Sequence, residues 1–266
     1  MYEKEKRSPL KEKPLRQAGQ GVQELLTDLI QDKYLPLVVL TTMAFGLMLT
    51  EWFRYIFHQP PHPYQLTVLF LIVLFYSIIR GRKILRQAKH IRQGRDGEKI
   101  VGQILDDLKF KGFYALHDIQ VKSKSGKRFN IDHVLIGPRG VFTIETKTWS
   151  KSKYDKIESD GKSLYIGGFK SEKDILAQPK AEAAWINEFI NERTGKAPYA
   201  KSILAFPGWF IDPSAQKFAK DYGVILVNPQ NALGAFIENE IEKINPEDVV
   251  LFVKLMKSYI RNFDYE

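Results

Sequence analysis

Two long apolar runs dominate the first third of the chain. The first covers residues 35–50 without a charged side chain, and the second covers residues 66–79 and is followed at once by Arg80. Each run is somewhat shorter than the roughly 20 residues that span the hydrocarbon core of a bilayer. Aromatic residues at the ends can extend each run into the membrane interface, where Trp and Tyr prefer to lie. The pattern therefore predicts a two-helix hairpin over residues 35–79 that anchors the chain in a lipid bilayer.

Positive charge flanks this hairpin but is absent from its connector. Residues 58–63 contain no Lys or Arg, whereas basic residues are dense before residue 35 and within residues 80–95. Because cytoplasmic flanks carry the excess of Lys and Arg, we expect a multi-pass protein of the cell membrane with both termini in the cytoplasm. A cleaved signal peptide fits poorly, since the first apolar run starts late and lacks a small-residue cleavage site. A buried hairpin of a soluble protein and one span misread as two are the alternatives.

The segments on either side of the hairpin are basic. Residues 1–34 are expected to form a basic cytoplasmic tail, either with a short amphipathic helix or flexible, and residues 80–93 a basic juxtamembrane linker. We expect residues 80–95 to contact anionic lipid headgroups, with nucleic-acid phosphates as the alternative. The net charge of +9 and the pI of about 9.4 agree with either negatively charged partner. The absence of cysteine excludes disulfides, thiolate zinc sites and cysteine nucleophiles.

From residue 94 onward helical and strand periods alternate, which predicts an α/β domain over residues 94–266. Helices are expected at residues 97–110, 174–193, 230–240 and 246–262. Strands are expected at residues 113–121, on both sides of a turn at 137–140, and at 163–168, 202–208 and 224–227. The last two strands are almost continuously apolar, which suits strands of a mixed sheet that are covered on both faces.

The candidate chemistry lies in the predicted hairpin at residues 130–149. Side chains alternate along a strand, so Glu145 and Lys147 share one face, and the antiparallel partner strand can bring Asp132 beside them. Two carboxylates can hold a hard divalent cation such as Mg²⁺ through oxygen ligands. Such a cation polarises a phosphodiester and lowers the pKa of a bound water, while a lysine can stabilise charge on the phosphate oxygens. A strand that ends in solvated charges is the alternative.

The residues around this hairpin resemble those of a known family. A helix that opens with Gly97 and Glu98, followed by the strands of residues 131–147, is similar to the nuclease-related domain (NERD) family. The resemblance covers residues from about 94 to 240. It implies a restriction-endonuclease-like fold of the PD-(D/E)xK type, in which helices flank a mixed β-sheet.

The resemblance also implies a role for each candidate site residue. Asp132 and Glu145 are expected to bind Mg²⁺ or Mn²⁺, and Glu98 to complete the metal shell from its helix. Lys147 is expected to support the nucleophile or the transition state. Gln178 matches a family glutamine that positions substrate or water, although the Asn-Pro that commonly precedes that glutamine is absent here. The alternatives are an acidic first helical turn for Glu98 and an ordinary helix surface for Gln178.

A basic loop lies between the first two predicted strands of the domain. Its cations could bind backbone phosphates of a nucleic acid without reading sequence, and they are Lys122, Lys124, Lys127 and Arg128. A solvated turn is the alternative. His133 lies on the opposite strand face from Asp132, so we interpret it as a packed or hydrogen-bonded histidine more readily than as a general base.

These features predict a membrane-anchored, metal-dependent nuclease that hydrolyses nucleic-acid phosphodiester bonds, with DNA as the expected substrate. A non-catalytic nucleic-acid-binding module and a membrane interaction scaffold are the alternatives. A homodimer is compatible with the resemblance, since many nucleases of this fold cut two strands as dimers. The sequence contains no Gly-rich phosphate loop, no serine nucleophile elbow and no His-Glu-x-x-His, which leaves nucleotide-driven motors and hydrolases of those classes unsupported.

Overall fold

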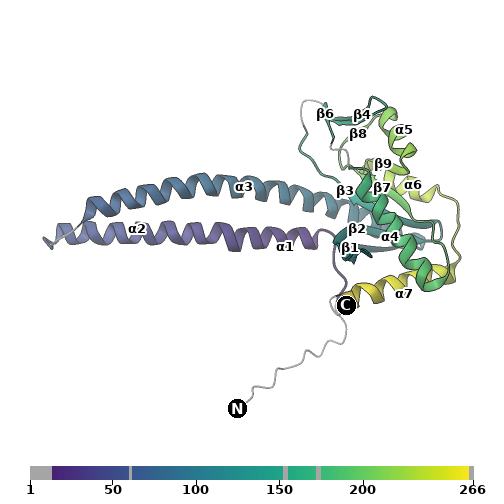
Figure 1. The fold of residues 1–266 in the computed structure, drawn as a ribbon, viewed down its shortest axis with the longest axis horizontal. Helices are drawn as coiled ribbons and strands as arrows, with labels where there is room; N and C mark the ends of the chain where they lie inside the picture. The colour runs from purple at the N-terminus through teal and green to yellow at the C-terminus, as the bar shows by residue number, and fades with distance from the viewer. Residues whose placement is uncertain (1–13, 60–61, 152–154, 172–174, 264–266) are drawn as a thin grey trace, which may run out of the picture. The chain divides into compact units, whose positions relative to one another are not determined.

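A computed structural model describes residues 14–59, 62–151, 155–171 and 175–263 of the chain. The chain divides into two compact units (Figure 1). One unit is Gly21–Arg95, and the other joins the residues up to Gln20 with Asp96–Glu266. The second unit is therefore discontinuous in sequence, and the first unit is an insertion within it.

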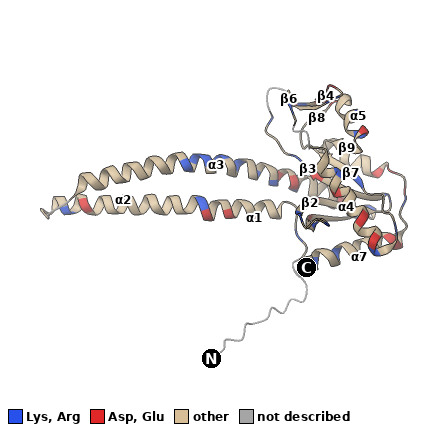
Figure 2. Cartoon of the chain, in the orientation of Figure 1, with Lys and Arg blue, Asp and Glu red and all other residues tan. Residues whose placement is uncertain are grey.

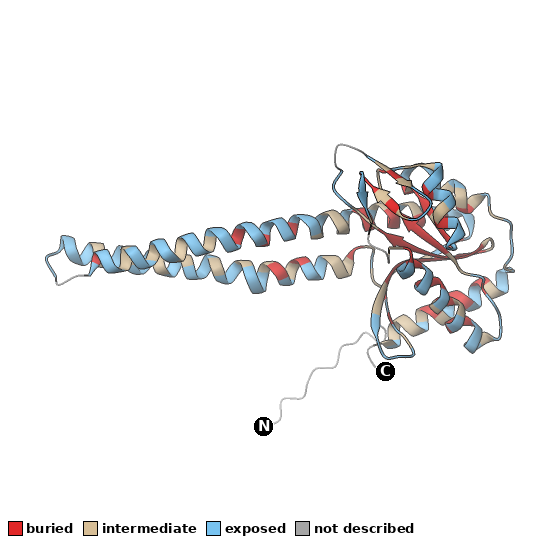
Figure 3. Ribbon diagram, turned by 45° about the horizontal axis from the view of Figure 1, so that its top comes forward, coloured by how far each residue is buried: buried red, intermediate tan, exposed pale blue. Residues whose placement is uncertain are grey.

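The inserted unit is helical. Its helices are α1 (Gln20–Asp28), η1 (Leu29–Tyr34), α2 (Leu35–Ile56) and the first part of α3 (Pro63–Asp107). The stretch Gln20–Ile56 is long and apolar enough to cross a membrane, and α2 has no buried residue (Figure 3). Large apolar side chains of both helices are exposed, including Met43 at 63% and Phe75 at 68%. Among the described residues, Gln20–Ile56 is the one helical stretch that meets this length and composition, so the second predicted span stays a prediction.

Helices α2 and α3 contact each other in antiparallel order. Trp52 Nε1 donates to Thr67 Oγ1 at 3.0 Å. Farther from the connector, Thr41 Oγ1 donates to Ser77 Oγ at 2.8 Å. The two predicted apolar runs therefore form a helical pair.

Helix α1 packs on the basic part of α3. Leu26 and Leu29 are buried against Ile84 and Ala88, and Figure 2 shows Lys and Arg positions in blue along this part of α3. The amphipathic pattern predicted near the chain start is thus satisfied by a helix of the same chain. The cations of residues 80–95 remain on the outer faces, because the buried positions of this segment are apolar or small.

The predicted helix start at Gly97 is wrong. Helix α3 runs without interruption from Pro63 to Asp107, through both Gly94 and Gly97. Glycine in a helix interior costs about 1 kcal/mol relative to alanine, which weakens a helix without ending it. Glu98 therefore lies in the interior of a long helix, and the helix dipole of a first turn does not explain its presence.

The second unit is built on a five-stranded mixed sheet. In spatial order its strands are β1 (Tyr114–Lys122), β2 (Arg128–Gly137), β3 (Gly140–Thr146), β7 (Lys201–Ala205) and β9 (Val224–Val227). Strands β1, β2 and β3 are antiparallel to one another, whereas β3, β7 and β9 are parallel. The structure confirms the α/β class and the mixed sheet.

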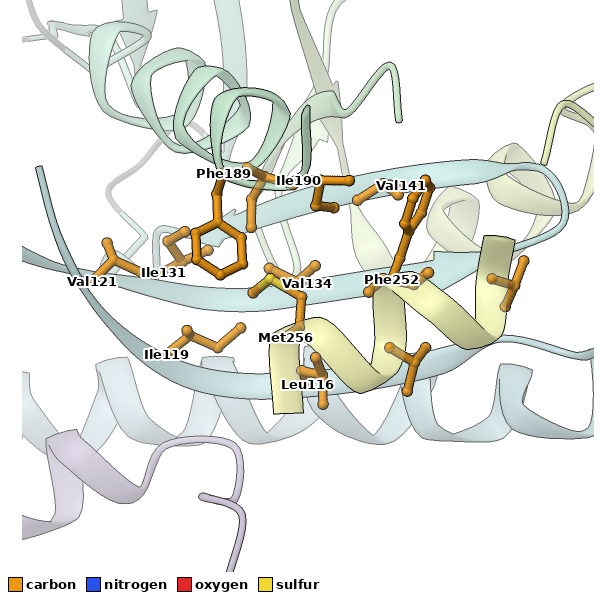
Figure 4. Close-up of a cluster of buried hydrophobic side chains, with 14 residues drawn as sticks. Leu116, Ile119, Val121, Ile131, Val134, Val141, Phe189, Ile190, Phe252 and Met256 are labelled. Carbon is orange, nitrogen blue, oxygen red and sulfur yellow. The ribbon is translucent and has the colours of Figure 1, made fainter. Parts of the chain in front are cut away.

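Helices α4 (Ala177–Thr194) and α7 (Pro246–Asn262) supply one layer of the core. Figure 4 shows Phe189 of α4 and Phe252 and Met256 of α7 packed with strand residues such as Val134. The asparagine predicted to cap α7 does so, since Asn245 Oδ1 accepts from the third following backbone N–H at 2.8 Å. Both helices are held to the sheet by buried apolar side chains.

A separate apolar cluster joins the sheet to α3 and the short helices. Val101 and Leu105 of α3 pack with Leu135 and Phe142 of the strands. The same cluster includes residues of η2 (Leu108–Lys111), η3 (Pro229–Leu233) and α6 (Gly234–Glu238). Helix α3 is therefore tied to the sheet by its last turns, and these turns follow Glu98 directly.

A second, smaller sheet was only partly predicted. In spatial order its strands are β6 (Phe169–Lys170), β5 (Leu164–Ile166), β4 (Lys156–Ser159) and β8 (Phe210–Ile211), and α5 (Pro213–Asp221) packs beside β4. The sequence indicated a strand at 163–168 alone. Strands of two to four residues are too short to display an alternating pattern, so tertiary packing decides their formation.

Residues 14–20 form an N-terminal strap that belongs to the second unit. Leu15 packs on the cluster shown in Figure 4, and Arg16 Nε donates to the buried Asp118 at 2.5 Å. A Cβ atom on Gly102 of α3 would lie 2.4 Å from the Cβ of Ala18, so the strap touches the helix backbone closely. The predicted domain boundary at residue 94 did not include this segment.

Candidate active site

The candidate site begins where β2 and β3 separate. Their backbone ladder ends at the pair His133 and Ile144. Beyond this pair Asp132 Oδ2 accepts a hydrogen bond from Thr146 N–H at 2.8 Å. Asp132 is 9% exposed. The Asp132 carboxylate therefore replaces a backbone carbonyl as the acceptor at the end of β3. This contact places Asp132 next to the residue that follows Glu145.

Glu145 and Lys147 lie together at the end of β3. Lys147 Nζ donates to Glu145 Oε1 at 2.5 Å and to Gln178 Oε1 at 3.2 Å. Gln178 is the second residue of α4. The structure thus brings three of the predicted residues into one hydrogen-bonded chain, which joins the end of β3 to the start of α4.

Glu182 belongs to the same cluster, although the sequence reasoning did not single it out. It is fully buried on α4, and its Oε1 accepts from Gln178 Nε2 at 3.0 Å. Glu182 Oε2 and Glu145 Oε2 are buried and have no hydrogen-bond partner among the described residues. A signal was available, because Glu182 follows Gln178 by four residues and lies between Ala181 and Ala183.

Glu98 enters the cluster from α3 because Gly97 allows a close approach. A Cβ atom on Gly97 would lie 1.8 Å from Thr148 Oγ1, just after β3. Glu98 is 9% exposed, and its carboxylate accepts a hydrogen bond from the backbone N–H of Gly19 in the strap. Glycine therefore has a packing role in this motif, and the strap contacts the candidate site directly.

Burial is the main cause that raises the pKa values of Glu98, Asp132 and Glu182 in this cluster. Burial and nearby negative charge raise the pKa of Glu98 to about 7. Burial, then repulsion from Glu145 and Glu98, raises the pKa of Asp132 well above its ordinary value. Burial, then repulsion from Glu145 and Asp132, raises the pKa of Glu182 to about 10. The surroundings therefore favour the protonated, uncharged form of these three carboxyl groups.

Lys147 is the cation in contact with this cluster. Burial alone would lower the pKa of its ammonium group, but Glu145, Asp132 and Glu182 together raise the pKa above its ordinary value. Lys147 therefore stays protonated at neutral pH and neutralises one charge. Several buried carboxylates remain around a single ammonium group.

The donor set fits a hard divalent cation. Among the residues that the structure describes, no three His, Asp or Glu side chains are already gathered around one point. However, Glu145 Oε2 and Glu182 Oε2 are buried and have no donor among the described residues. Carboxylate oxygens are the ligands that Mg²⁺ and Mn²⁺ prefer, and a bound cation would satisfy both of these oxygens.

His133 is packed rather than placed to act on a substrate. It is fully buried, and its Nδ1 lies 2.8 Å from Nδ1 of His117. Burial lowers the pKa of His133 well below its ordinary value, and His117 lowers it further. The structure agrees with the interpretation of a packed, hydrogen-bonded histidine, which is neutral at physiological pH.

The basic loop contributes less free charge than its sequence indicates. Lys124 pairs with Glu188 and Glu192 of α4. The Arg128 guanidinium lies 5.6 Å from the ring centre of Phe263. Two of the four predicted phosphate-binding cations therefore have partners within the chain. Their role, together with that of Lys122 and Lys127, stays a prediction.

Comparison with known proteins identifies a family over the part of the chain that contains this site. Residues 93–207 match the family described as NERD, nuclease-related domain. An uncharacterized protein of Bacillus anthracis is 32% identical over 82 residues, which are 31% of this chain and 39% of that protein. The match thus spans well under half of the relative's length. The family match covers residues 93–207, which are less than half of the chain.

One solved structure gives a more distant match. It is Can2 from Sulfobacillus thermosulfidooxidans in complex with cyclic tetra-adenylate, at 14% identity and a TM-score of 0.33. The match covers 61% of this chain and 45% of that chain. A likeness at this level carries no argument about the site.

Proposed function

We propose that the second unit is a metal-dependent nuclease of the restriction-endonuclease-like type. The observation that carries this proposal is the cluster of four buried carboxylates around Lys147 where β2 and β3 separate. The functional groups are Glu98, Asp132, Glu145, Glu182, Lys147 and Gln178. Burying several carboxylates together is costly unless a cation compensates them, so the arrangement favours function over stability.

Each group then has a chemical task. Asp132 and Glu145 would hold Mg²⁺ or Mn²⁺, with Glu98 and the unpartnered Glu182 oxygen completing the shell. The bound cation would polarise the scissile phosphate and lower the pKa of a water. Lys147 is held by the Gln178 amide at 3.2 Å, which orients the ammonium group toward charge that develops on the phosphate oxygens.

We further propose that residues 35–79 cross a membrane twice. The strap and residues 96–266 form one compact unit, so the insertion between them has to leave and return on one side of a membrane. A segment that leaves and returns on the same side crosses the membrane an even number of times. Two crossings, one by α2 and one by α3, are therefore favoured over a single crossing. The Lys and Arg side chains of residues 80–95 would then lie on the cytoplasmic side and contact anionic headgroups.

Nuclease activity can be tested with the full-length chain in detergent micelles, since residues 94–266 alone lack the strap. The protein is incubated with supercoiled plasmid, linear duplex, single-stranded DNA and RNA in Mg²⁺, Mn²⁺ or EDTA. We expect metal-dependent cutting that falls by about 100- to 1,000-fold in Glu145→Gln and in Lys147→Ala. Glu188→Gln is the matched control, because this α4 carboxylate is exposed and pairs with Lys124.

The other outcomes each contradict the proposal in a recognisable way. Equal cutting by the site variants and the wild type would place the activity elsewhere or in a contaminant. Tight, salt-sensitive binding without cutting would instead support the nucleic-acid-binding module. Binding to anionic vesicles alone, with no nucleic-acid affinity, would support the membrane scaffold.

A further inference from the structure

A pocket adjoins the candidate active site on the side of the small sheet. It has a volume of about 830 Å³ and shares Lys147 and Gln178 with the site. Its remaining described lining consists of aromatic, apolar and basic side chains and two serines: Trp149, Ser150, Ile166, Phe169, Lys170, Ser171, Ile175, Ala177 and Trp209. The volume lies within the range of about 300–1,000 Å³ that is typical of small-molecule sites.

The aromatic side chains of this pocket are unequally exposed. Phe169 is 72% exposed and Trp149 is 39% exposed, whereas Trp209 is 2% exposed. Phe169 lies on β6, a strand of two residues, and Trp149 follows β3 directly. Two accessible rings thus stand at the rim, and a buried ring lies farther in. A flat ring system entering the pocket would meet apolar and aromatic surface.

The charge of the pocket suits an anionic ligand. A neighbouring pocket of about 520 Å³ shares Lys170, Ser171, Ile175 and Ala177 with the first and adds Lys162 and Lys180. Among the described residues that line the two pockets, four are lysines and none is acidic. The carboxylates of the active site lie beyond Lys147. A positive track therefore leads along α4 and the small sheet to the candidate metal site.

We infer that this pocket holds an unpaired nucleotide of the nucleic acid that is cut, with its base against Phe169 and Trp149 and its phosphates on the lysine track. The inference rests on the proposed nuclease function and names its substrate class. A base inside a duplex is stacked and cannot enter a pocket that reaches a buried tryptophan. The preferred substrates are therefore single strands, frayed ends or nucleotides that have left the stack.

Aromatic stacking gives the inference a direct test in binding. Full-length protein in detergent micelles is titrated against a labelled single-stranded oligothymidylate and a labelled blunt duplex, at one fixed salt concentration. Ca²⁺ in one series and EDTA in the other separate binding from cutting. Stacking on an aromatic side chain contributes enough that removing one ring weakens binding by about 5- to 150-fold.

We expect Phe169→Ala and Trp149→Ala to weaken single-strand binding by that factor and to leave duplex binding unchanged. Phe110→Ala is the matched control, because Phe110 is 94% exposed and does not line the pocket. Phe169 is the primary variant, since an exposed ring can be removed without opening the core. Unchanged single-strand affinity in both variants, or equal losses for single strand and duplex, would overturn the inference.

The two proposals can fail separately. Metal-dependent cutting with no effect of either aromatic variant on single-strand binding would leave the nuclease and remove the pocket. Loss of single-strand binding in the aromatic variants, without cutting by the wild type, would leave the pocket and remove the catalytic assignment.

Discussion

At the scale of single residues, the carboxyl groups of the candidate site share an electrostatic constraint. Glu98, Asp132 and Glu182 are all buried beside other negative groups, and burial is the leading cause that raises the pKa of each. A carboxyl group with a raised pKa keeps its proton in the folded state at a pH where the same group ionises in the unfolded state. Ionisation then favours the unfolded state, so the free energy of unfolding falls as pH rises. The site therefore links the stability of the unit to pH and to bound cations.

Metal-free protein should become less stable as pH rises above the ordinary carboxyl value of 4.5. Between that value and about 7 for Glu98, or about 10 for Glu182, the folded state binds more protons than the unfolded state. Each group then lowers the free energy of unfolding by at most about 1.4 kcal/mol per pH unit. Below 4.5 the unfolded groups are protonated too, and the loss disappears.

Thermal unfolding of wild type and Glu182→Gln, measured in EDTA from pH 4.5 to 8, checks this expectation. The variant should melt higher than the wild type at pH 8 and equally at pH 4.5. Added Mg²⁺ should stabilise the wild type at pH 8 more than the variant. A difference in melting temperature between wild type and Glu182→Gln that stays constant from pH 4.5 to 8 would show that Glu182 keeps no proton in the folded state. Glu188→Gln is the control for a general effect of removing a negative charge.

The sequence predicted those site residues whose proximity follows from the alternation of side chains along a strand or from the spacing of residues on a helix. Alternation along β3 placed Glu145 and Lys147 together, and the antiparallel partner brought in Asp132. It did not reveal Glu182, although the spacing of four residues from Gln178 was a usable signal. The contact of Gly19 with Glu98 joins segments about 80 residues apart, which no local pattern encodes.

At the scale of elements, α3 carries two glycines with different surroundings. Gly94 has open space where a Cβ would lie, whereas a Cβ on Gly97 would meet Thr148 at 1.8 Å. Both lie in the interior of one continuous helix. Substitution of Gly94 therefore tests only the conformational cost of glycine in a helix, whereas substitution of Gly97 also tests the close contact with Thr148.

Gly94→Ala should stabilise the protein by about 0.5–1 kcal/mol, because alanine favours the helix and meets no neighbour. Gly97→Ala should destabilise it by about 1–3 kcal/mol and reduce cutting, because α3 has to move away from the end of β3. Thermal unfolding and the plasmid assay measure both effects. Thr148→Ala in the Gly97→Ala background should restore part of the loss, and no recovery would place the defect elsewhere.

Helices and strands were predicted well where the hydrophobic pattern extended over many residues. The five strands of the main sheet and α4 and α7 were expected at nearly their observed positions, because burial on one or both faces imposes a clear pattern. A helix start was wrongly predicted within α3, because Gly97 was interpreted as a helix boundary. The small sheet was largely missed, because β6 and β8 contain two residues each, which is too short to display an alternating pattern.

At the scale of the whole molecule, the two compact units set a topological condition. The chain leaves the second unit at Gln20 and returns to it at Asp96. A single crossing would separate the strap from the sheet, even though Arg16 and Asp118 pair directly. The proposed double crossing keeps them on the same side.

Cysteine labelling can check this arrangement, because the chain has no cysteine of its own. Gln59→Cys should react with a membrane-impermeant maleimide in intact cells, since it lies in the connector between α2 and α3. Ser125→Cys, in the β1–β2 loop, should react only after the cells are lysed. Labelling of both positions in intact cells, or of Ser125→Cys alone, would contradict the proposed topology.

The strap also sets an order of events during synthesis. Its residues leave the ribosome before the helical insertion, yet Gly102 and Asp118, which they contact, follow the insertion in sequence. At about 5–20 residues per second, translation of the roughly 75 intervening residues takes about 4–15 s. The contact between Gly19 and Glu98 can form only after this interval. A newly made chain therefore completes the carboxylate cluster only after residues 21–95 have been made. Under the proposed function, the anchor is then made before the active site is complete, so no active nuclease exists without its anchor.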